Sequence, residues 1–232
     1  MVKSFLKVFS AVLLGLLFLC TLNAYAQKYE VGLGIGGLNY TGDMVRDYRI
    51  ENNRPGGLVL FRYNVNDYVS LRGHFMGGAL HGNDDKPIDA FADARNAPDF
   101  TISVLELAGV VEYYFLDYKE NINLLRWSPY FFIGLGGSWF GQHEDPQENY
   151  SSFQPVIPFG LGFKYLISRE WSVGVEGGAR KTFFDYIDNL SGGDLTNKNL
   201  QYGNKYDKDW YYFVGFTVSY TFYTIPCPYH FQ

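Results

Sequence analysis

The most constraining feature of the chain is a strict alternation of side-chain character close to its C-terminus. From Trp210 to Phe222 every second residue is apolar or aromatic, and most of the residues between them are small or carry a hydroxyl. Successive side chains of a β-strand point to opposite faces of a sheet, so this pattern predicts a strand with one apolar face. A strand of this length, with aromatic residues on the apolar face, is typical of a wall that faces lipid.

Seven further segments alternate in the same way, so the sequence predicts an even number of strands, eight in all. The predicted strands are 29–39, 57–65, 68–79, 101–115, 129–140, 155–166, 171–184 and 210–222. The connections 40–56, 80–100, 141–154 and 185–209 are long, whereas 66–67 and 167–170 are tight and 116–128 is intermediate. Outer-membrane barrels have short periplasmic turns and long external loops. The predicted fold class is therefore all-β, an eight-stranded antiparallel transmembrane β-barrel with both termini in the periplasm.

The two faces of the predicted strands differ in charge. One face carries apolar rows, such as Val31, Leu33 and Ile35 in the first strand. The opposite face holds four acids and four bases: Glu30, Arg62, Arg72, Glu106, Glu112, Lys164, Glu176 and Arg180. A soluble eight-stranded barrel would instead bury its apolar residues and expose its polar ones. The face that carries the charges therefore separates a membrane barrel from a lipocalin-like one.

The predicted barrel is too narrow to hold an open channel. Eight strands leave a lumen that side chains fill, and an unpaired buried charge costs several kcal/mol. We therefore expect a plugged polar interior in which the eight inward charges pair with one another. We also expect inward glycines on the first and seventh strands to leave room for Tyr211 and Phe213 on the last strand. These glycines are Gly32, Gly34, Gly36, Gly174 and Gly178.

The N-terminal residues have the pattern of a secretory signal. Lys3 and Lys7 precede an apolar stretch, and an A-x-A sequence ends at Ala26, so we expect residues 1–26 to be cleaved. The expected mature chain comprises a barrel over 27–223 and a periplasmic tail over 224–232. Its formal charge is 17 minus 24, or −7, because the removed segment contains two lysines and no acid. An acidic chain of this kind argues against binding to nucleic acid.

Cys227 is the one cysteine that remains after the predicted cleavage. An odd cysteine in the oxidising periplasm either pairs with another chain or stays a free thiol, and the sequence leaves both alternatives open.

Three motifs with possible chemistry have simpler explanations. The glycine-rich stretch 32–37 lies within an alternating strand with no following helix, which disfavours a dinucleotide loop. His74 and Ser138 could belong to a lipid-modifying enzyme, but their spacing assembles no triad. Loop acids could bind Ca²⁺, although no fixed ligand spacing is present; they are Asp84, Asp85, Asp89, Asp93, Asp99, Asp185, Asp188 and Asp194. We expect no catalytic site, no metal site and no cofactor.

Several stretches give the mature chain a resemblance to a known family. They are Gly37-Leu-Asn-Tyr-Thr-Gly-Asp43, Pro129-Tyr-Phe-Phe-Ile-Gly134, Pro158-Phe-Gly-Leu-Gly-Phe-Lys-Tyr165, Arg180-Lys-Thr-Phe-Phe-Asp-Tyr-Ile-Asp188 and the Cys-Pro tail. They resemble the PorG-like outer-membrane proteins of Bacteroidetes. This resemblance implies a non-enzymatic component of the type IX secretion system, which in some species also supports gliding motility. It further implies a periplasmic partner, a ring complex of a lipoprotein and its companion protein.

The predicted periplasmic surface supplies the candidate partner-binding residues. They are Asn66, Asp67, Asp117, Lys119, Glu120, Arg126, Arg169, Glu170 and Cys227. The last strand also resembles the terminal signals that the barrel-assembly machinery reads, and the outer-membrane lipid is the expected surrounding of the wall. An adhesin or envelope-stability barrel that acts through its long external loops is the alternative function.

Overall fold

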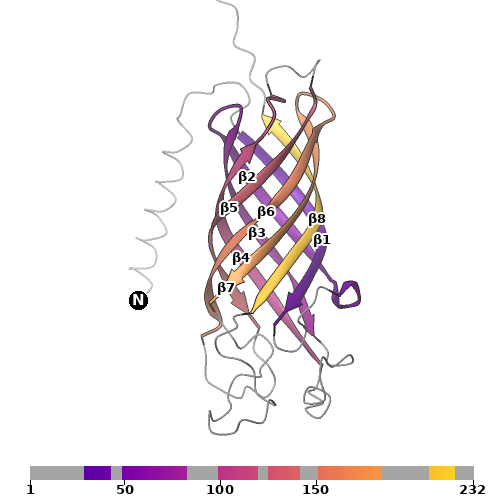
Figure 1. Ribbon diagram of the computed structural model, residues 1–232, viewed down its shortest axis with the longest axis vertical. Coiled ribbons are helices and arrows are strands. Elements are labelled where there is room, and N and C mark those ends of the chain that lie inside the picture. The colour runs from indigo at the N-terminus through magenta and orange to yellow at the C-terminus, as the bar shows by residue number, and fades with distance from the viewer. Residues whose placement is uncertain are drawn as a thin grey trace, which may run out of the picture.

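Eight antiparallel strands close into a barrel, which confirms the predicted all-β, eight-stranded antiparallel fold (Figure 1). The computed structural model describes residues 29–42, 49–82, 99–119, 125–141, 151–183 and 209–222. The strands are β1 (Tyr29–Thr41), β2 (Arg54–Asn64), β3 (Val69–Gly82), β4 (Phe100–Tyr114), β5 (Trp127–Phe140), β6 (Phe153–Leu166), β7 (Trp171–Thr182) and β8 (Trp210–Phe222). A short 3-10 helix, η1 (Ile50–Asn52), precedes β2.

Each strand pairs with its neighbours in sequence, and the first strand pairs with the last. The β1–β8 seam runs from Tyr29 opposite Phe222 to Thr41 opposite Trp210. The tight turns at 65–68 and 167–170 lie at the end of the barrel where β1 begins and β8 ends, and we call this the short-turn end (Figure 1). The opposite end, where the long connections join the strands, is the long-loop end.

Four strands, β2, β4, β5 and β6, begin one to three residues earlier than the sequence predicts. β2 starts at Arg54 and includes Pro55, which falls in the predicted 40–56 connection, although proline cannot donate a backbone hydrogen bond to a neighbouring strand. Pro55 lies opposite Gly37 of β1, whereas the β2–β3 pairing begins only at Gly56. Proline is therefore accommodated where the strand has a partner on one side. Similarly, β6 begins at Phe153, ahead of Pro155.

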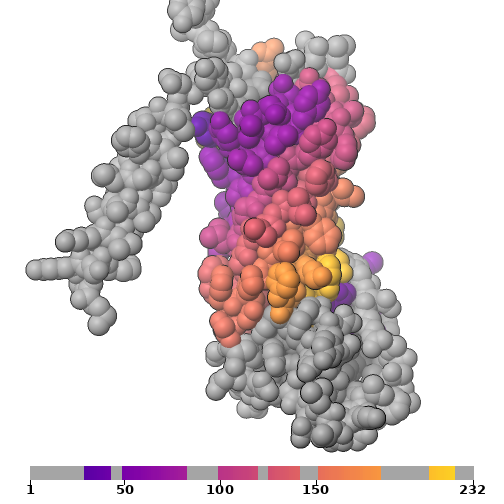
Figure 2. All heavy atoms as spheres, turned by 60° about the vertical axis from the view of Figure 1, so that its left-hand side comes forward, coloured from indigo at the N-terminus to yellow at the C-terminus, as the bar shows by residue number. Residues whose placement is uncertain are grey.

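The outer wall is apolar along the length of the barrel. Outward side chains such as Leu33, Ile35 and Leu135 are 65%, 74% and 71% exposed, and the strand side chains form a continuous wall in the space-filling view (Figure 2). Aromatic side chains gather near both ends, with Trp127 and Trp171 at the short-turn end and Trp139 at the long-loop end. This distribution is opposite to that of a lipocalin and matches the apolar band and aromatic girdles of a membrane barrel.

The interior contains two apolar and aromatic clusters and a set of buried charges. The long-loop half is filled by apolar side chains, among them Leu38, Leu80, Phe100 and Phe213. The short-turn half is filled by Val110, Tyr114, Tyr118, Tyr130, Phe132 and Leu166. Charged and hydroxylated side chains lie between and among these clusters, and all eight predicted interior charges are at most 4% exposed.

Inward glycines make room for rings, but the ring nearest to Gly178 is not one of the two that the sequence predicts. A Cβ on Gly36 would lie 2.9 Å from the ring of Phe213, as expected. By contrast, a Cβ on Gly178 would lie 2.6 Å from Phe132 of β5, and Gly160 has the same neighbour at 2.8 Å. Phe132 lies opposite Gly160, which in turn lies opposite Gly178, so its ring covers the two glycines of the neighbouring strands β6 and β7.

No helix formed by the described residues has the length and apolar character needed to cross a membrane.

Candidate functional site

A row of six charged side chains with alternating sign crosses the interior from the short-turn side. Its first members are Lys164, Glu30 and Arg62, which β6, β1 and β2 contribute. The Lys164 Nζ donates to Glu30 Oε2 at 2.6 Å, and Arg62 Nη1 donates to the other oxygen of Glu30. Inward side chains from three strands therefore form one ion-paired group, because the inward faces of all strands in a closed barrel point toward its axis.

The row continues through Glu112 and Arg72 to Glu176. Arg62 Nε donates to Glu112 Oε2 at 2.5 Å, and Arg72 Nε lies 3.2 Å from Glu112 Oε1. Arg72 Nη1 then donates to Glu176 Oε2 at 2.5 Å. Three bases and three acids make the row neutral as a whole, which limits the cost of burying it.

Aromatic side chains make further hydrogen bonds and ring contacts with this row. The hydroxyl of Tyr114 donates to Glu112 at 2.7 Å, and that of Tyr130 donates to Glu176 at 2.9 Å. The guanidinium of Arg72 lies 4.7 Å above the centre of the Phe132 ring, a favourable cation–π contact. The row is thus held by hydrogen bonds and by rings as well as by charge.

A second, smaller cluster lies on the long-loop side of the row. Glu106 accepts hydrogen bonds from Tyr211 at 2.5 Å and from Arg180 at 3.3 Å, and its other oxygen lies 2.6 Å from His74 Nε2. The hydroxyl of Ser138 lies 2.6 Å from that of Tyr211. His74 and Ser138, which the enzyme alternative would combine, are therefore linked only through Glu106 and Tyr211, inside a sealed interior.

All eight charges expected in the interior are buried, and each one makes at least one ion pair. Alternation places His74 inward beside Arg72 and Tyr211 inward on the last strand, whereas sequence reasoning did not assign Tyr114 or Tyr130 to the network. A usable signal was present for Tyr114, because it lies two residues from Glu112 and hence on the same face. The remaining contacts depend on how strands far apart in sequence meet across the lumen.

The short-turn end brings together residues from three connections. Lys119 Nζ donates to the backbone oxygen of Asn66 at 3.0 Å and to Ser70 Oγ at 3.1 Å. The backbone oxygen of Arg126 accepts from Leu166 at 2.7 Å, and that of Glu170 accepts from Thr221 at 2.7 Å. Through these contacts the 65–68 turn, the described residues 115–119 and 125–126, and the 167–170 turn belong to one rim.

Seven of the nine candidate partner-binding residues lie on this rim: Asn66, Asp67, Asp117, Lys119, Arg126, Arg169 and Glu170. Glu120 and Cys227 lie outside the described residues, as do the predicted signal segment and tail. The loop acids considered as Ca²⁺ ligands also lie outside, except Asp99. Among the described residues, no three His, Cys, Asp or Glu side chains group in a way that could hold a metal ion.

Lys119 covers the interior at the short-turn end. Its ammonium group lies 4.8 Å from the centre of the Tyr114 ring and 5.7 Å from that of Tyr118. Burial, together with the positive charges of Lys164 and Arg62, lowers the pKa of Lys119 from 10.5 to about 7. The rim therefore contains a cation whose charge changes near neutral pH.

Comparisons with solved structures identify the type of fold. Neisserial surface protein A has a TM-score of 0.53 with 10% identity, and the match covers 86% of this chain and all of that one. The attachment invasion locus protein Ail of Yersinia pestis gives 0.48 at 12% identity, covering 85% and 100%. OprG from Pseudomonas aeruginosa gives 0.45 at 12% identity, covering 87% and 99%. The likeness to Neisserial surface protein A supports an eight-stranded outer-membrane barrel fold and nothing beyond the fold.

The comparison of sequences assigns a family without a function. No curated protein matches the chain. Residues 7–230 match a family described as a domain of unknown function, DUF6089. Because this match spans nearly the whole sequence, the chain belongs to the DUF6089 family.

Proposed function

We propose that this protein is a non-enzymatic outer-membrane component of the type IX secretion machinery, with its short-turn end in the periplasm. In this role the barrel anchors a contact surface, and the surface binds a periplasmic ring complex of a lipoprotein and its companion protein. Support for gliding motility belongs to the same proposal. The resemblance to PorG-like proteins supplies the identity of the machinery.

The observation that carries the proposal is the sealed interior. Paired charges fill the middle of the lumen, and packed side chains fill both halves. A lumen of this kind offers no path for substrates, so activity has to reside on an outer surface. The short-turn end provides a polar surface of seven described residues, four of which, Asn66, Lys119, Arg126 and Glu170, make backbone or side-chain hydrogen bonds there.

Deleting the gene and measuring export of proteins with C-terminal sorting domains tests this role. We expect export to fall sharply and to recover when the intact gene is restored. Normal export in the deletion strain would contradict the proposal.

Charge reversal then separates the short-turn surface from the long external loops. We expect Arg126→Glu combined with Arg169→Glu to reduce export while the barrel is still assembled. The matched control is Glu51→Lys, an exposed charge of η1 near the long-loop end. Under the adhesin alternative the effects would be reversed, with the control variant impairing surface activity and the double variant exporting normally.

A further inference from the structure

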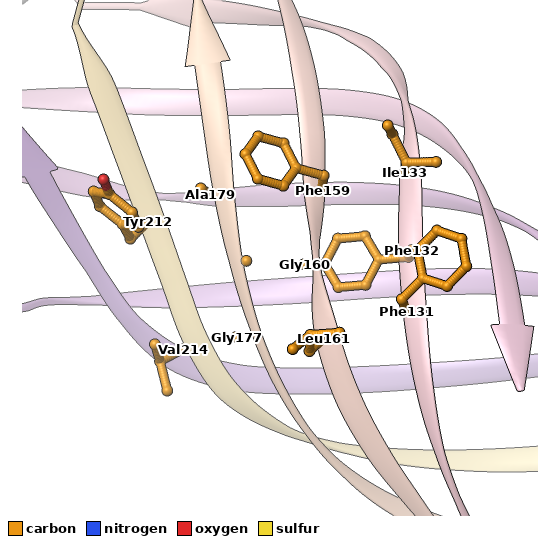
Figure 3. A pocket seen from close by; sticks show the side chains of 11 residues that line it. Phe131, Phe132, Ile133, Phe159, Gly160, Leu161, Gly177, Ala179, Tyr212 and Val214 are labelled. Atoms are coloured by element: carbon orange, nitrogen blue, oxygen red, sulfur yellow. The ribbon is translucent and has the colours of Figure 1, made fainter. Parts of the chain in front are cut away.

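The outer wall is hollowed over β5–β8. The hollow has a volume of about 680 Å³. Gly177 and Ala179 of β7 form its floor, with Phe159 and Leu161 of β6 on one side and Tyr212 of β8 on the other (Figure 3). The cause is local, because β7 presents two small outward residues between strands that present large ones. The lining is almost entirely apolar, so its occupant must be apolar as well.

A single charged side chain lies beyond the lining of this hollow, on the same outward face of β7. Lys181 follows Ala179 by two residues on the same face of β7, which places it roughly 7 Å further toward the long-loop end. Its Nζ lies 5.4 Å from the centre of the Trp210 ring, and Trp210 contacts Phe159 edge to face at 6.0 Å. The hollow and the cation are therefore connected through packed rings.

Lys181 is exceptional on this surface. Of all the outward residues of the eight strands, it alone is a lysine, arginine, aspartate or glutamate. No ion pair joins it to a described carboxylate. A second hollow of about 660 Å³ over β1–β3, which includes Gly57 and Gly77, has no such cation on the outward faces of its strands. The two hollows differ in charge while they are similar in size.

We propose that the hollow over β5–β8 is a binding site for a lipid with a phosphate headgroup. One acyl chain lies on Gly177 and Ala179, and the phosphate contacts the ammonium group of Lys181 beside Trp210. A cation near the end of an apolar wall attracts anionic headgroups, and a tryptophan at that depth is favoured in the interfacial region. The inference rests on the membrane location of the barrel and is independent of its role in secretion.

Native mass spectrometry of the purified barrel tests the site, with phosphatidylglycerol and phosphatidylcholine of identical acyl chains as probes. We expect the barrel to retain phosphatidylglycerol preferentially. Lys181→Gln should lower that preference roughly fivefold, as the loss of one interfacial positive charge predicts. Gly177→Leu should lower binding of both lipids about tenfold or more, because the leucine side chain fills the hollow.

The control is Gly57→Leu, which fills the second hollow and should leave the preference unchanged. Substitution is tolerated at both positions, since a Cβ on Gly57 or Gly177 meets no atom closer than 3.8 Å, and a heat-dependent gel shift verifies folding. An unchanged preference in Lys181→Gln would overturn the proposal, as would equal losses in Gly57→Leu and Gly177→Leu. A dimer that Gly177→Leu abolishes without changing lipid binding would overturn it too, by assigning the hollow to a second copy of the chain.

Discussion

At the scale of single residues, the interior is organised around shared carboxylates. Glu30 lies between Lys164 and Arg62, and Glu112 lies between Arg62 and Arg72. Removing one member of such a row leaves its partner buried without compensation, which costs about 3–5 kcal/mol in buried pairs. Removing an acid and a base together avoids that penalty. Stability therefore depends on the balance of the network more than on any one pair.

The Arg180–Glu106 pair provides a direct test of this balance. We expect Arg180→Met and Glu106→Gln each to lower the free energy of unfolding by about 3–5 kcal/mol. The double variant should lose less than the sum of the two, because neither charge then remains unpaired. Urea unfolding in detergent micelles measures all four proteins. Additive losses would show that the two side chains do not interact across the 3.3 Å between them.

Lys119 predicts a pH dependence at the short-turn end. Its pKa in the folded protein is about 7, below the ordinary 10.5, so between these values the unfolded chain binds more protons than the folded one. The free energy of unfolding should therefore rise with pH across this window, and this contribution should be flat below pH 7. Lys119→Met removes the group and should flatten the rise. Unfolding of both proteins at pH 6, 8 and 9 measures it, and identical pH profiles would contradict the assignment.

At the scale of elements, inward and outward glycines differ in the free space around them, so we expect the same substitution to affect stability differently at the two kinds of position. A Cβ on Gly36 would lie 2.3 Å from the Val214 backbone oxygen, whereas a Cβ on Gly73 meets nothing within 4 Å. Neither position has a positive φ, so the difference is one of space. We expect Gly36→Ala to cost about 1–3 kcal/mol through overpacking. Gly73→Ala should be neutral or stabilising by up to about 1 kcal/mol. Equal effects on the urea midpoint would refute this reading of the β1–β8 seam.

The register of the closing seam can be tested by disulfide formation. Val31 lies opposite Tyr220, at a separation that a disulfide can bridge. In a background with Cys20 and Cys227 replaced by serine, we expect Val31→Cys with Tyr220→Cys to cross-link rapidly on oxidation. The pair Val31→Cys with Val218→Cys is shifted by two residues and should cross-link slowly. Faster bonding in the shifted pair would show a different register.

At the scale of the whole molecule, alternation alone predicts most of the fold. All eight strands and the burial of the eight charges follow from parity, because each strand has one face toward lipid, and the alternation of long and short connections gives their antiparallel arrangement. Alternation does not predict that Phe132 of β5 reaches Gly160 and Gly178 of β6 and β7, or that Tyr211 joins Ser138 to Glu106. Such contacts depend on the shear of the barrel and on side-chain length. The start of β2 at Arg54 was missed because proline and glycine usually mark loops.

The short-turn surface is the other property that belongs to the whole molecule, since three connections and the end of β8 contribute to it. Its candidate residues were chosen as the predicted periplasmic connections and tail, and the barrel places seven of them on one rim. Sequence cannot establish what binds there, because a contact surface has no spacing rule comparable to that of a strand.

Site-specific photo-crosslinking in intact cells tests the central claim most directly. A photoreactive residue would replace Asn66, Arg126 or Arg169 at the short-turn end, or Ile50 at the long-loop end, where this side chain is 78% exposed. The account predicts adducts with a periplasmic protein from the three short-turn positions and none from Ile50. Adducts from Ile50 alone, or none from the short-turn positions in cells that assemble the barrel and export normally, would contradict it.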